Sequence, residues 1–271
     1  MNLIQLSAWD LAISASLIGI LALLSVSLQL RVARELLVAA GRMIAQLLLV
    51  GLVLKALFSY VSLWLVGAVS LVMLAVAGYE VMQRQTRPFR GVWGYGMGTA
   101  SMFASSFTLT IFALLVPVSA TPWYHPQYAI PLLGMILGNT MNGISLALDR
   151  VTQSCWDQRE TIEQRLMLGQ TGSQALAEIR RYSIRSGLIP IINAMAVAGI
   201  VSLPGMMTGQ ILAGAPPEEA VKYQILIMFL IAGGSGLGTL VSVQLSVRRL
   251  FDQRDRLRLE RLRLPSSSGA K

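Results

Sequence analysis

Long apolar runs without charged side chains alternate with short basic segments along the whole chain. A helix that crosses a bilayer needs about 20 mostly apolar residues, and seven segments come close to that length. They are Leu11–Leu30, Leu36–Phe58, Val61–Tyr79, 94–116, 129–148, Ser186–Ala215 and Tyr223–Val247. The pattern predicts an all-α, polytopic membrane protein of about seven transmembrane helices, with residues 1–271 forming a single transmembrane domain.

Prolines decide where some of these segments begin and end. Residues 91–148 contain no Asp, Glu, Lys or Arg, a stretch long enough for two spans. The four prolines of residues 117–131 prevent one continuous helix there, and the aromatic residues between them suit a membrane–water interface. Pro204 is expected to bend or interrupt the span Ser186–Ala215.

The composition agrees with a membrane protein. Hydrophobic residues make up 54% of the chain and charged residues 13%, well below the roughly 25% charged of soluble domains. The net charge of +9 does not indicate nucleic acid, because the basic residues fall between apolar runs and in the tail. One Cys and one His exclude a disulfide within the chain and argue against a conventional zinc site.

The basic residues also predict the orientation. Apart from Lys55 and Lys222, every Lys and Arg falls on one side of the predicted spans. The positive-inside rule then places the N-terminus outside and the C-terminus in the cytoplasm, across an inner (plasma) membrane. Seven spans give the odd number that this orientation requires.

Only one loop between the predicted spans is long, and the orientation places it in the cytoplasm. It covers residues 149–185, with apolar residues at helical spacing. Leu168-Gly169 breaks it into two short helices, and Thr171 or Ser173 can cap the second. The simplest interpretation is a solvated helical hairpin, and the alternative is a knob that docks onto a partner.

The sequence lacks the usual signs of an energy source. None of the three lysines follows a glycine, so no G-x-x-x-x-G-K-[ST] loop for ATP is present. No span carries a charged residue near its middle, as proton-coupled carriers usually do. A His-Glu-x-x-His or paired-Asp constellation of an intramembrane enzyme is also absent. We therefore expect a non-catalytic transport subunit without a cofactor of its own, energised by a partner if it moves solute uphill.

The cytoplasmic loop resembles the EAA-type coupling motif of ABC importer-like permeases. Residues Glu163–Pro190 give an acidic residue, then Leu-Gly, then Ile-Pro about twenty residues later. A short helix, a glycine break and a second helix form a knob that seats in an ATPase and transmits its closure. Gln164 and Arg165 depart from the motif, where two alanines are usual. The resemblance implies these ATPase-coupling residues: Glu163, Leu168, Gly169, Thr171, Ser173 and Pro190.

Four further segments make the resemblance more specific. Gly41–Gly51, Pro131–Asn142, Val201–Gly214 and Ala220–Ile225 are similar to the FetB-type permease family, also catalogued as an uncharacterised membrane family. The similarity extends over nearly the whole chain. It implies a permease homodimer paired with two copies of a cytoplasmic ATP-binding subunit. Bacterial members are implicated in iron export, and plant relatives are linked to aluminium tolerance and sugar-nucleotide transport.

These implications leave the cargo and the energy source open at the level of sequence. An ATP-driven exporter of iron is the leading expectation. An ABC permease for an organic solute such as a sugar nucleotide is the first alternative. A channel or secondary carrier that needs neither ATP nor the projecting knob is the second.

Polar positions within the spans are candidates for a transport path. Arg42 and Gln46 share a helix face, either as a gate or anion contact or because Arg42 snorkels to the interface. Asn139 and Asn142 follow a G-x-x-x-G pair and either bond across helices or contact a cation. The hydroxyls crowding the fourth span either line the same cavity or bond back to their own helix. Gly234-x-x-x-Gly238 predicts close packing.

The sixth span contains the other candidate. Pro204, Gly205, Met206 and Met207 interrupt it, and broken helices in transporters mark where substrate passes. Thioethers favour Cu(I), but methionine also fills gaps between packed helices, so metal ligands stay unassigned.

The tail after the last span, residues 248–271, is basic. Leu250, Leu257 and Leu264 recur at heptad spacing, which predicts an amphipathic helix. The helix rests on anionic headgroups or docks onto the ATPase. Residues 265–271 have the composition of a disordered end.

Overall fold

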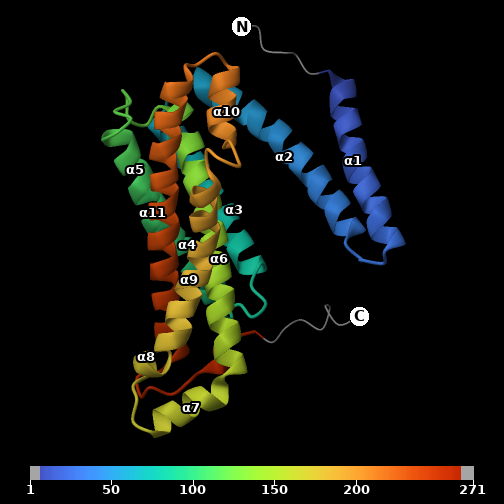
Figure 1. Ribbon diagram of the computed structural model, residues 1–271. Helices are drawn as coiled ribbons and strands as arrows, with labels where there is room; N and C mark the ends of the chain where they lie inside the picture. Colours follow the sequence, from blue (N-terminus) through green and yellow to red (C-terminus); the bar gives the residue numbers. More distant parts are fainter. Residues whose placement is uncertain (1–6, 264–271) are drawn as a thin grey trace. The chain divides into compact units, whose positions relative to one another are not determined.

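The computed structural model of the chain describes residues 7–263, and most of them are helical (Figure 1). The elements are α1 (Ala8–Ser27), α2 (Ala33–Ser59), α3 (Leu63–Gln83), α4 (Val92–Met102), the π-helix η1 (Phe103–Phe107), α5 (Thr108–Leu115), α6 (Pro126–Asp157), α7 (Arg159–Met167), α8 (Gly172–Ala175), α9 (Ala177–Val197), α10 (Gly205–Leu212), α11 (Pro217–Leu250) and the 3-10 turn η2 (Leu259–Arg261). Within these residues β-structure is limited to isolated bridges. The all-α prediction is confirmed.

Six continuous helical segments within residues 7–263 are long and apolar enough to cross a bilayer. They are Trp9–Ser27, Ala33–Ser59, Leu63–Gln83, Val92–Leu115, Pro126–Asp157 and Pro217–Leu250. They agree with six of the seven predicted spans. The remaining prediction, Ser186–Ala215, corresponds to two helices, because α9 ends at Val197 and α10 begins only at Gly205.

Local sequence explains where several helices begin. Ser7 caps α1 in a capping box, in which its hydroxyl and the carboxylate of Asp10 each accept a backbone N–H of the other residue. Pro126 and Pro217 occupy the first turns of α6 and α11, where a missing N–H costs nothing. The break between α5 and α6 falls within the proline-rich segment, as predicted.

Contacts divide the chain into two compact units. In the described chain, the first consists of residues 7–61 and 212–215. It contains α1 and α2, two neighbouring helices joined by the short turn at residues 28–32. Ala22 and Ser25 are the buried residues of α1.

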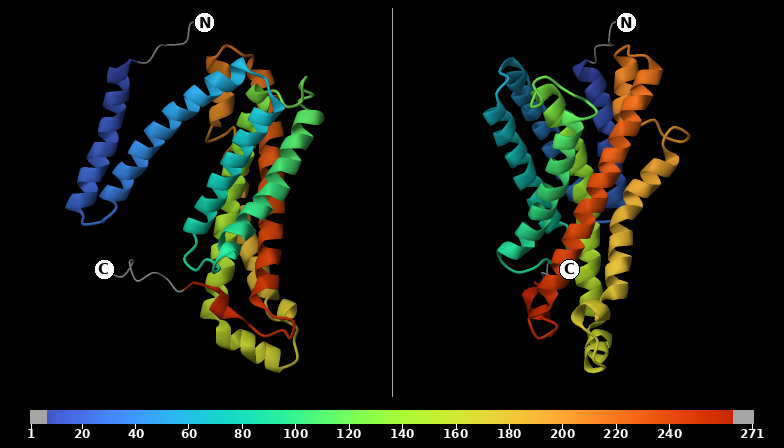
Figure 2. Two further views of the ribbon diagram at one scale, coloured as in Figure 1. Left: turned by 180° about the vertical axis from the view of Figure 1, so that it is seen from behind. Right: turned by 90° about the vertical axis from the view of Figure 1, so that its left-hand side faces the viewer.

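The second unit, residues 62–211 and 216–263, is a helical bundle around two long central helices (Figure 2). The helices α6 and α11 pack along each other, α9 packs on both, and α3 and α4 lie against each other and against α6. A Cβ built on Gly187 of α9 would lie 2.6 Å from the carbonyl oxygen of Gly143 on α6. The two backbones are therefore in direct contact at that crossing.

The last span packs equally closely. A Cβ on Gly234 would lie 2.9 Å from Ile136, and one on Gly238 would lie 2.7 Å from Thr140. Small residues allow this approach between membrane helices. The predicted packing role of Gly234-x-x-x-Gly238 is confirmed.

Three segments of the chain lie at one end of this bundle, because successive helices run in opposite directions. The α3–α4 loop, the α7–α8 segment and the end of α11 meet there. A hydrophobic cluster joins these segments. It contains Phe89 of the α3–α4 loop, Ile162 and Leu176 of the α7–α8 segment, Leu250 at the end of α11, and Leu262 beyond it.

Residues 251–263, called the strap from here on, cross this end of the bundle in a mainly extended form. Leu262 forms an isolated bridge with Phe89. The N–H of Arg263 donates to the carbonyl of Pro88 (2.9 Å), and the N–H of Arg90 donates to the carbonyl of Arg261 (2.8 Å). The strap thereby links the end of α11 to the α3–α4 loop.

The strap corrects one sequence prediction. An amphipathic helix over 248–264 is wrong beyond Leu250, where α11 ends. The extended backbone allows Phe251 and Leu262 to bury their side chains in the shared cluster, which a continuing helix would carry away from it. Leu264 and the predicted disordered end, 265–271, lie outside the described residues.

Candidate coupling hairpin and transport path

The helices α7 and α8 form a hairpin between the ends of α6 and α9 (Figure 1). It is called the coupling hairpin from here on and covers residues 159–176. Gly169 reverses the chain with a φ of +88°, a conformation that residues with a Cβ rarely adopt. Thr171 caps α8 in a capping box with Gln174 (Thr171 N to Gln174 Oε1, 2.9 Å). The predicted break and one of the two predicted caps are observed.

An arginine closes the open side of the hairpin. Arg165 on α7 donates one hydrogen bond to the carbonyl of Ala175 (3.2 Å) and another to the carboxylate of Glu178 on α9 (2.8 Å). The hydrogen bond and the charge of Arg165 hold the pKa of Glu178 below its usual range. Ile162 and Leu176 are buried beneath this contact. Polar and apolar contacts therefore both fix the hairpin on the bundle.

The tip of the hairpin is apolar and exposed. Met167 is 79% exposed and Leu168 83% exposed, with Gly169 directly after them. Contiguous exposed apolar side chains on a projecting element are typical of an interaction site. The surface formed by Met167, Leu168 and Gly169 is called the tip from here on.

The predicted coupling residues fall into two groups. Glu163, Leu168, Gly169, Thr171 and Ser173 all lie on the hairpin. Ser173 does not cap α8, and its hydroxyl accepts a 3.5 Å hydrogen bond from Arg180. Pro190 lies inside α9, far along the chain from the tip, and lines a separate cavity.

That cavity is a polar niche between α3, α6 and α9. It has a volume of about 350 Å³ and is lined by Arg84, Asn142, Ser145, Leu146, Asp149 and Pro190. Arg84 donates a hydrogen bond of 2.6 Å to the amide oxygen of Asn142. Asp149 accepts the backbone N–H of Thr86 (2.7 Å). The niche thus combines one fixed cation with carboxylate and amide oxygens.

The sequence predicted only part of this niche. Asn142 and Pro190 were candidate site residues, whereas Arg84 and Asp149 were not. Their position in sequence carried a signal, since charged residues that end adjacent antiparallel spans meet at the same membrane face. Asn139, one turn from Asn142, donates instead to its own helix at the carbonyl of Met135 (2.8 Å).

Most hydroxyls of the predicted fourth span bond to their own helix, but Ser106 Oγ is buried without a hydrogen-bond partner among the described residues. Ser101, Ser105 and Thr110 each donate to the carbonyl four residues earlier. This bonding occupies the protons of these three hydroxyls, so the part of the fourth span in a transport path stays a prediction. Arg42 and Gln46 are exposed on α2 in the first unit, so their part in a path stays a prediction.

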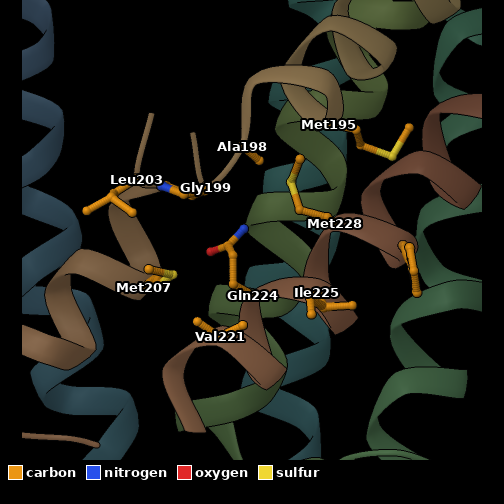
Figure 3. Close-up of a pocket in the computed structure, with 11 residues that line it drawn as sticks. Met195, Ala198, Gly199, Leu203, Met207, Val221, Gln224, Ile225 and Met228 are labelled. Carbon is orange, nitrogen blue, oxygen red and sulfur yellow. The ribbon is translucent and has the colours of Figure 1, made fainter. Parts of the chain in front are cut away.

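The break between α9 and α10 borders an apolar cavity of the second unit (Figure 3). Its volume is about 560 Å³, and it is lined by Met195, Ala198, Gly199, Leu203, Pro204, Met207, Val221, Gln224, Ile225, Met228 and Phe229. The predicted residues Pro204 and Met207 belong to it, whereas Gly205 and Met206 lie beside it on α10 without lining it. Two of the four predicted residues thus line the cavity, together with residues of α11 that were not predicted.

One polar group faces this apolar space. The amide of Gln224 points between Met207 and Met228 in Figure 3, and the residue is only 8% exposed. Its Oε1 has no hydrogen-bond partner among the described residues. Within residues 7–263 no three His, Cys, Asp or Glu side chains gather as metal ligands would.

The fold and these sites together define a polytopic α-helical membrane protein with a projecting helical hairpin. The profile of the "Uncharacterised protein family (UPF0014)" matches residues 8–251, and the chain belongs to this family. The predicted family resemblance is confirmed.

Three relatives illustrate the range of the family. A UPF0014 membrane protein of Synechocystis is 41% identical over 94% of this chain and 98% of its own length. The "Probable iron export permease protein FetB" of Escherichia coli is 32% identical over 97% of this chain and 99% of its own. The protein ALUMINUM SENSITIVE 3 of Arabidopsis thaliana is 33% identical over 82% and 80%, respectively. No solved structure matches the chain.

Proposed function

We propose that the protein is the transmembrane permease subunit of an ABC transporter, which exports iron with ATP hydrolysed by a separate cytoplasmic subunit. The exposed apolar tip of the coupling hairpin carries the proposal. Met167 and Leu168 project from a hairpin whose base is fixed by Arg165 and buried apolar residues. An apolar surface on a rigid element is suited to seat in a cleft of a partner.

The architecture of the bundle supports transmission from this tip. The hairpin continues directly into α6 and α9, and these helices touch backbone to backbone at Gly143 and Gly187. Close-packed helices move as rigid bodies rather than deforming. Displacement of the tip would therefore move both walls of the polar niche and the broken end of α9 together.

The name of the Escherichia coli relative, a probable iron export permease, supports iron as cargo. The carboxylate of Asp149 lines the niche, and carboxylate oxygens suit a partly hydrated divalent cation. We also propose a homodimer in which two copies enclose the path, as the family resemblance implies. The orientation follows the basic residues, with the hairpin in the cytoplasm of an inner-membrane protein.

The apolar cavity at the helix break favours a second candidate. Its methionine and aliphatic lining, with Gln224 as a single hydrogen-bonding group, fits an organic solute better than a free cation. An ABC permease for an organic molecule is therefore the alternative within the same transporter class.

The coupling role is tested by capture of ATP-binding subunits from the same genome on purified permease. Leu168→Glu places a charge on the tip and is expected to reduce capture at least tenfold, since truncating central contact residues costs this much at interfaces. Thr161→Glu adds the same charge at another exposed hairpin position and should retain capture. Equal capture by both variants, or none by the parent, would favour an ATP-independent channel or carrier.

A further inference from the structure

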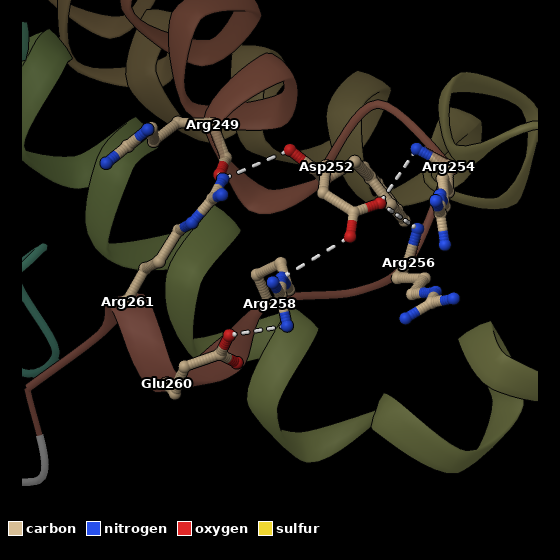
Figure 4. A network of polar contacts seen from close by, with 8 residues as sticks. Arg249, Asp252, Arg254, Arg256, Arg258, Glu260 and Arg261 are labelled. Atoms are coloured by element: carbon tan, nitrogen blue, oxygen red, sulfur yellow. Dashed lines mark hydrogen bonds and ion pairs between the residues drawn. The ribbon is translucent and has the colours of Figure 1, made fainter.

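The strap forms a concave surface rich in arginine beside the coupling hairpin (Figure 4). A depression of about 610 Å³ lies there, lined by six arginines, with Asp252 as its acidic residue. It is called the arginine basin from here on. The arginines are Arg248, Arg249, Arg254, Arg256, Arg258 and Arg261.

Two of these arginines, Arg258 and Arg261, hold the strap in place. Arg261 donates to the backbone carbonyls of Arg249 and Phe251, which fixes the strap against the end of α11. Arg258 lies 3.5 Å from the carboxylate of Asp252 and 3.2 Å from that of Glu260. Asp252 and Glu260 are thus both paired with Arg258, whereas Asp255 is exposed between Arg254 and Arg256.

Asp252 shapes the loop that carries Arg254 and Arg256. Its carboxylate accepts the backbone N–H groups of Arg256 (3.0 Å) and Arg254 (2.9 Å). The hydrogen bond from Arg256, and then that from Arg254, lower the pKa of Asp252. In Figure 4, the side chains of Arg254 and Arg256 point away from Asp252.

Three arginines of the basin have no side-chain hydrogen bond or ion pair among the described residues. They are Arg248, Arg254 and Arg256, and all three are exposed. Guanidinium groups bind phosphate oxygens in a bidentate geometry that no other side chain reproduces. A prearranged surface with three such groups indicates an anionic ligand with several oxygens.

Arginine–aromatic pairs place the basin near the headgroup level of a bilayer. Arg249 stacks 4.5 Å over Trp93 at the start of α4, and Arg87 stacks 4.2 Å over Trp156 on α6. Tryptophan and arginine are typical of the membrane interface. Val92 and Trp93 are themselves exposed and offer an apolar surface next to the basin.

We propose that the arginine basin binds the phosphate group of an anionic phospholipid, whose acyl chains lie along the exposed start of α4. A free phosphate and a lipid headgroup both present phosphate oxygens to the arginines. The apolar surface next to the basin favours the lipid, because acyl chains can lie on it. Phe251 of the strap packs on Gly172 of the hairpin, where a Cβ would lie 2.7 Å from the ring. A lipid that holds the strap in place therefore also supports the hairpin. The proposal does not depend on the ABC function.

The test is native mass spectrometry of the full-length permease in a neutral detergent. Phosphatidylglycerol is the probe, phosphatidylcholine the uncharged comparison, and inorganic phosphate the competitor. The variant Arg248→Gln/Arg254→Gln/Arg256→Gln leaves Arg249, Arg258 and Arg261 in place. The control Arg34→Gln/Arg159→Gln/Arg185→Gln removes the same charge from exposed positions elsewhere.

We expect the parent and the control to bind phosphatidylglycerol with affinities within twofold of each other, and the basin variant to bind at least tenfold more weakly. Phosphatidylcholine should bind all three proteins equally and weakly. Equal loss in both variants would show non-specific charge attraction and overturn the site. Displacement of the lipid by inorganic phosphate at equal concentration would overturn the lipid assignment. A basin variant with an unchanged thermal midpoint excludes loss of the fold.

Discussion

Arg165 on α7 donates a 2.8 Å hydrogen bond to the carboxylate of Glu178 at the start of α9, and this contact closes the coupling hairpin. A second hydrogen bond from the same guanidinium reaches the carbonyl of Ala175. Position 165 is where the chain departs from the EAA-type motif, in which two alanines are usual. At this position Arg165 stands where the motif has a small residue, and its two hydrogen bonds hold the hairpin in shape.

Replacing Arg165 by Ala is expected to loosen the hairpin without unfolding the bundle. Amide hydrogen exchange of residues 165–176 should rise about fivefold, the equivalent of about 1 kcal/mol for one net hydrogen bond. Gln164→Ala changes the neighbouring exposed residue and should leave exchange unchanged. Identical exchange in the Arg165 variant and the parent would show that the tie does not fix the hairpin.

The same contact has a defined pH dependence. The folded pKa of Glu178 is lowered, so the tie is fully present above the ordinary carboxyl pKa of about 4.5. It is lost only as the pH falls through the lower, folded pKa. Hairpin exchange, corrected for the intrinsic chemical rate, should therefore stay constant from pH 8 to pH 5. A change in the corrected exchange rate between pH 8 and pH 5 would show that a group other than Glu178 titrates and controls the hairpin.

The contact between α6 and α9 predicts a stability difference between two glycines. Gly187→Ala would place its methyl group 2.6 Å from the carbonyl of Gly143 and should cost about 1–3 kcal/mol. Gly138→Ala meets nothing within 4 Å and should be neutral or stabilising. Thermal unfolding in detergent compares the two variants, and equal midpoints would argue against the close crossing.

The polar niche predicts unequal roles for two asparagines on one helix. Asn142→Leu removes the acceptor of Arg84 and should lower transport at least tenfold, because a charged donor is left unpaired. Asn139→Leu removes only a bond to its own helix and should retain most transport. The measurement is export from proteoliposomes at matched protein levels. An equal loss of transport in both variants would show that the niche is not part of the transport path.

The strap predicts a change in protease sensitivity. Leu262 is 1% exposed in the shared cluster, so Leu262→Asp should release the strap and speed tryptic cleavage at Arg254 and Arg256 severalfold. Gln253→Asp adds the same charge at an exposed strap position and should cleave at the parent rate. Cleavage at the parent rate in both variants would show that the burial of Leu262 does not hold the strap.

Features governed by local sequence were predictable. Long apolar runs required membrane helices, the segment with four prolines required a break before Pro126, and Gly169 required a turn between two short helices. Pro204 also marked an interruption, although the chain leaves helix already after Val197. In each case the backbone chemistry of a few neighbouring residues decides the outcome.

Features governed by distant contacts were not predictable. Leu250, Leu257 and Leu264 suggested a helical tail, but the buried positions of Phe251 and Leu262 are created by the α3–α4 loop and the hairpin. Asn139 and Asn142 look alike in sequence, and only the position of Arg84 distinguishes them. The wall that α11 contributes to the apolar cavity required the three-dimensional arrangement for the same reason.

In the proposed mechanism, the tip couples ATP hydrolysis to transport. The most direct measurement is ATP-dependent iron movement by the reconstituted permease and ATP-binding subunit, in vesicles with the hairpin facing outward. We predict that the parent and Thr161→Glu accumulate iron only with ATP, and that Leu168→Glu loses at least nine-tenths of this accumulation. Iron movement that is independent of ATP, or unaffected by Leu168→Glu, would contradict the account.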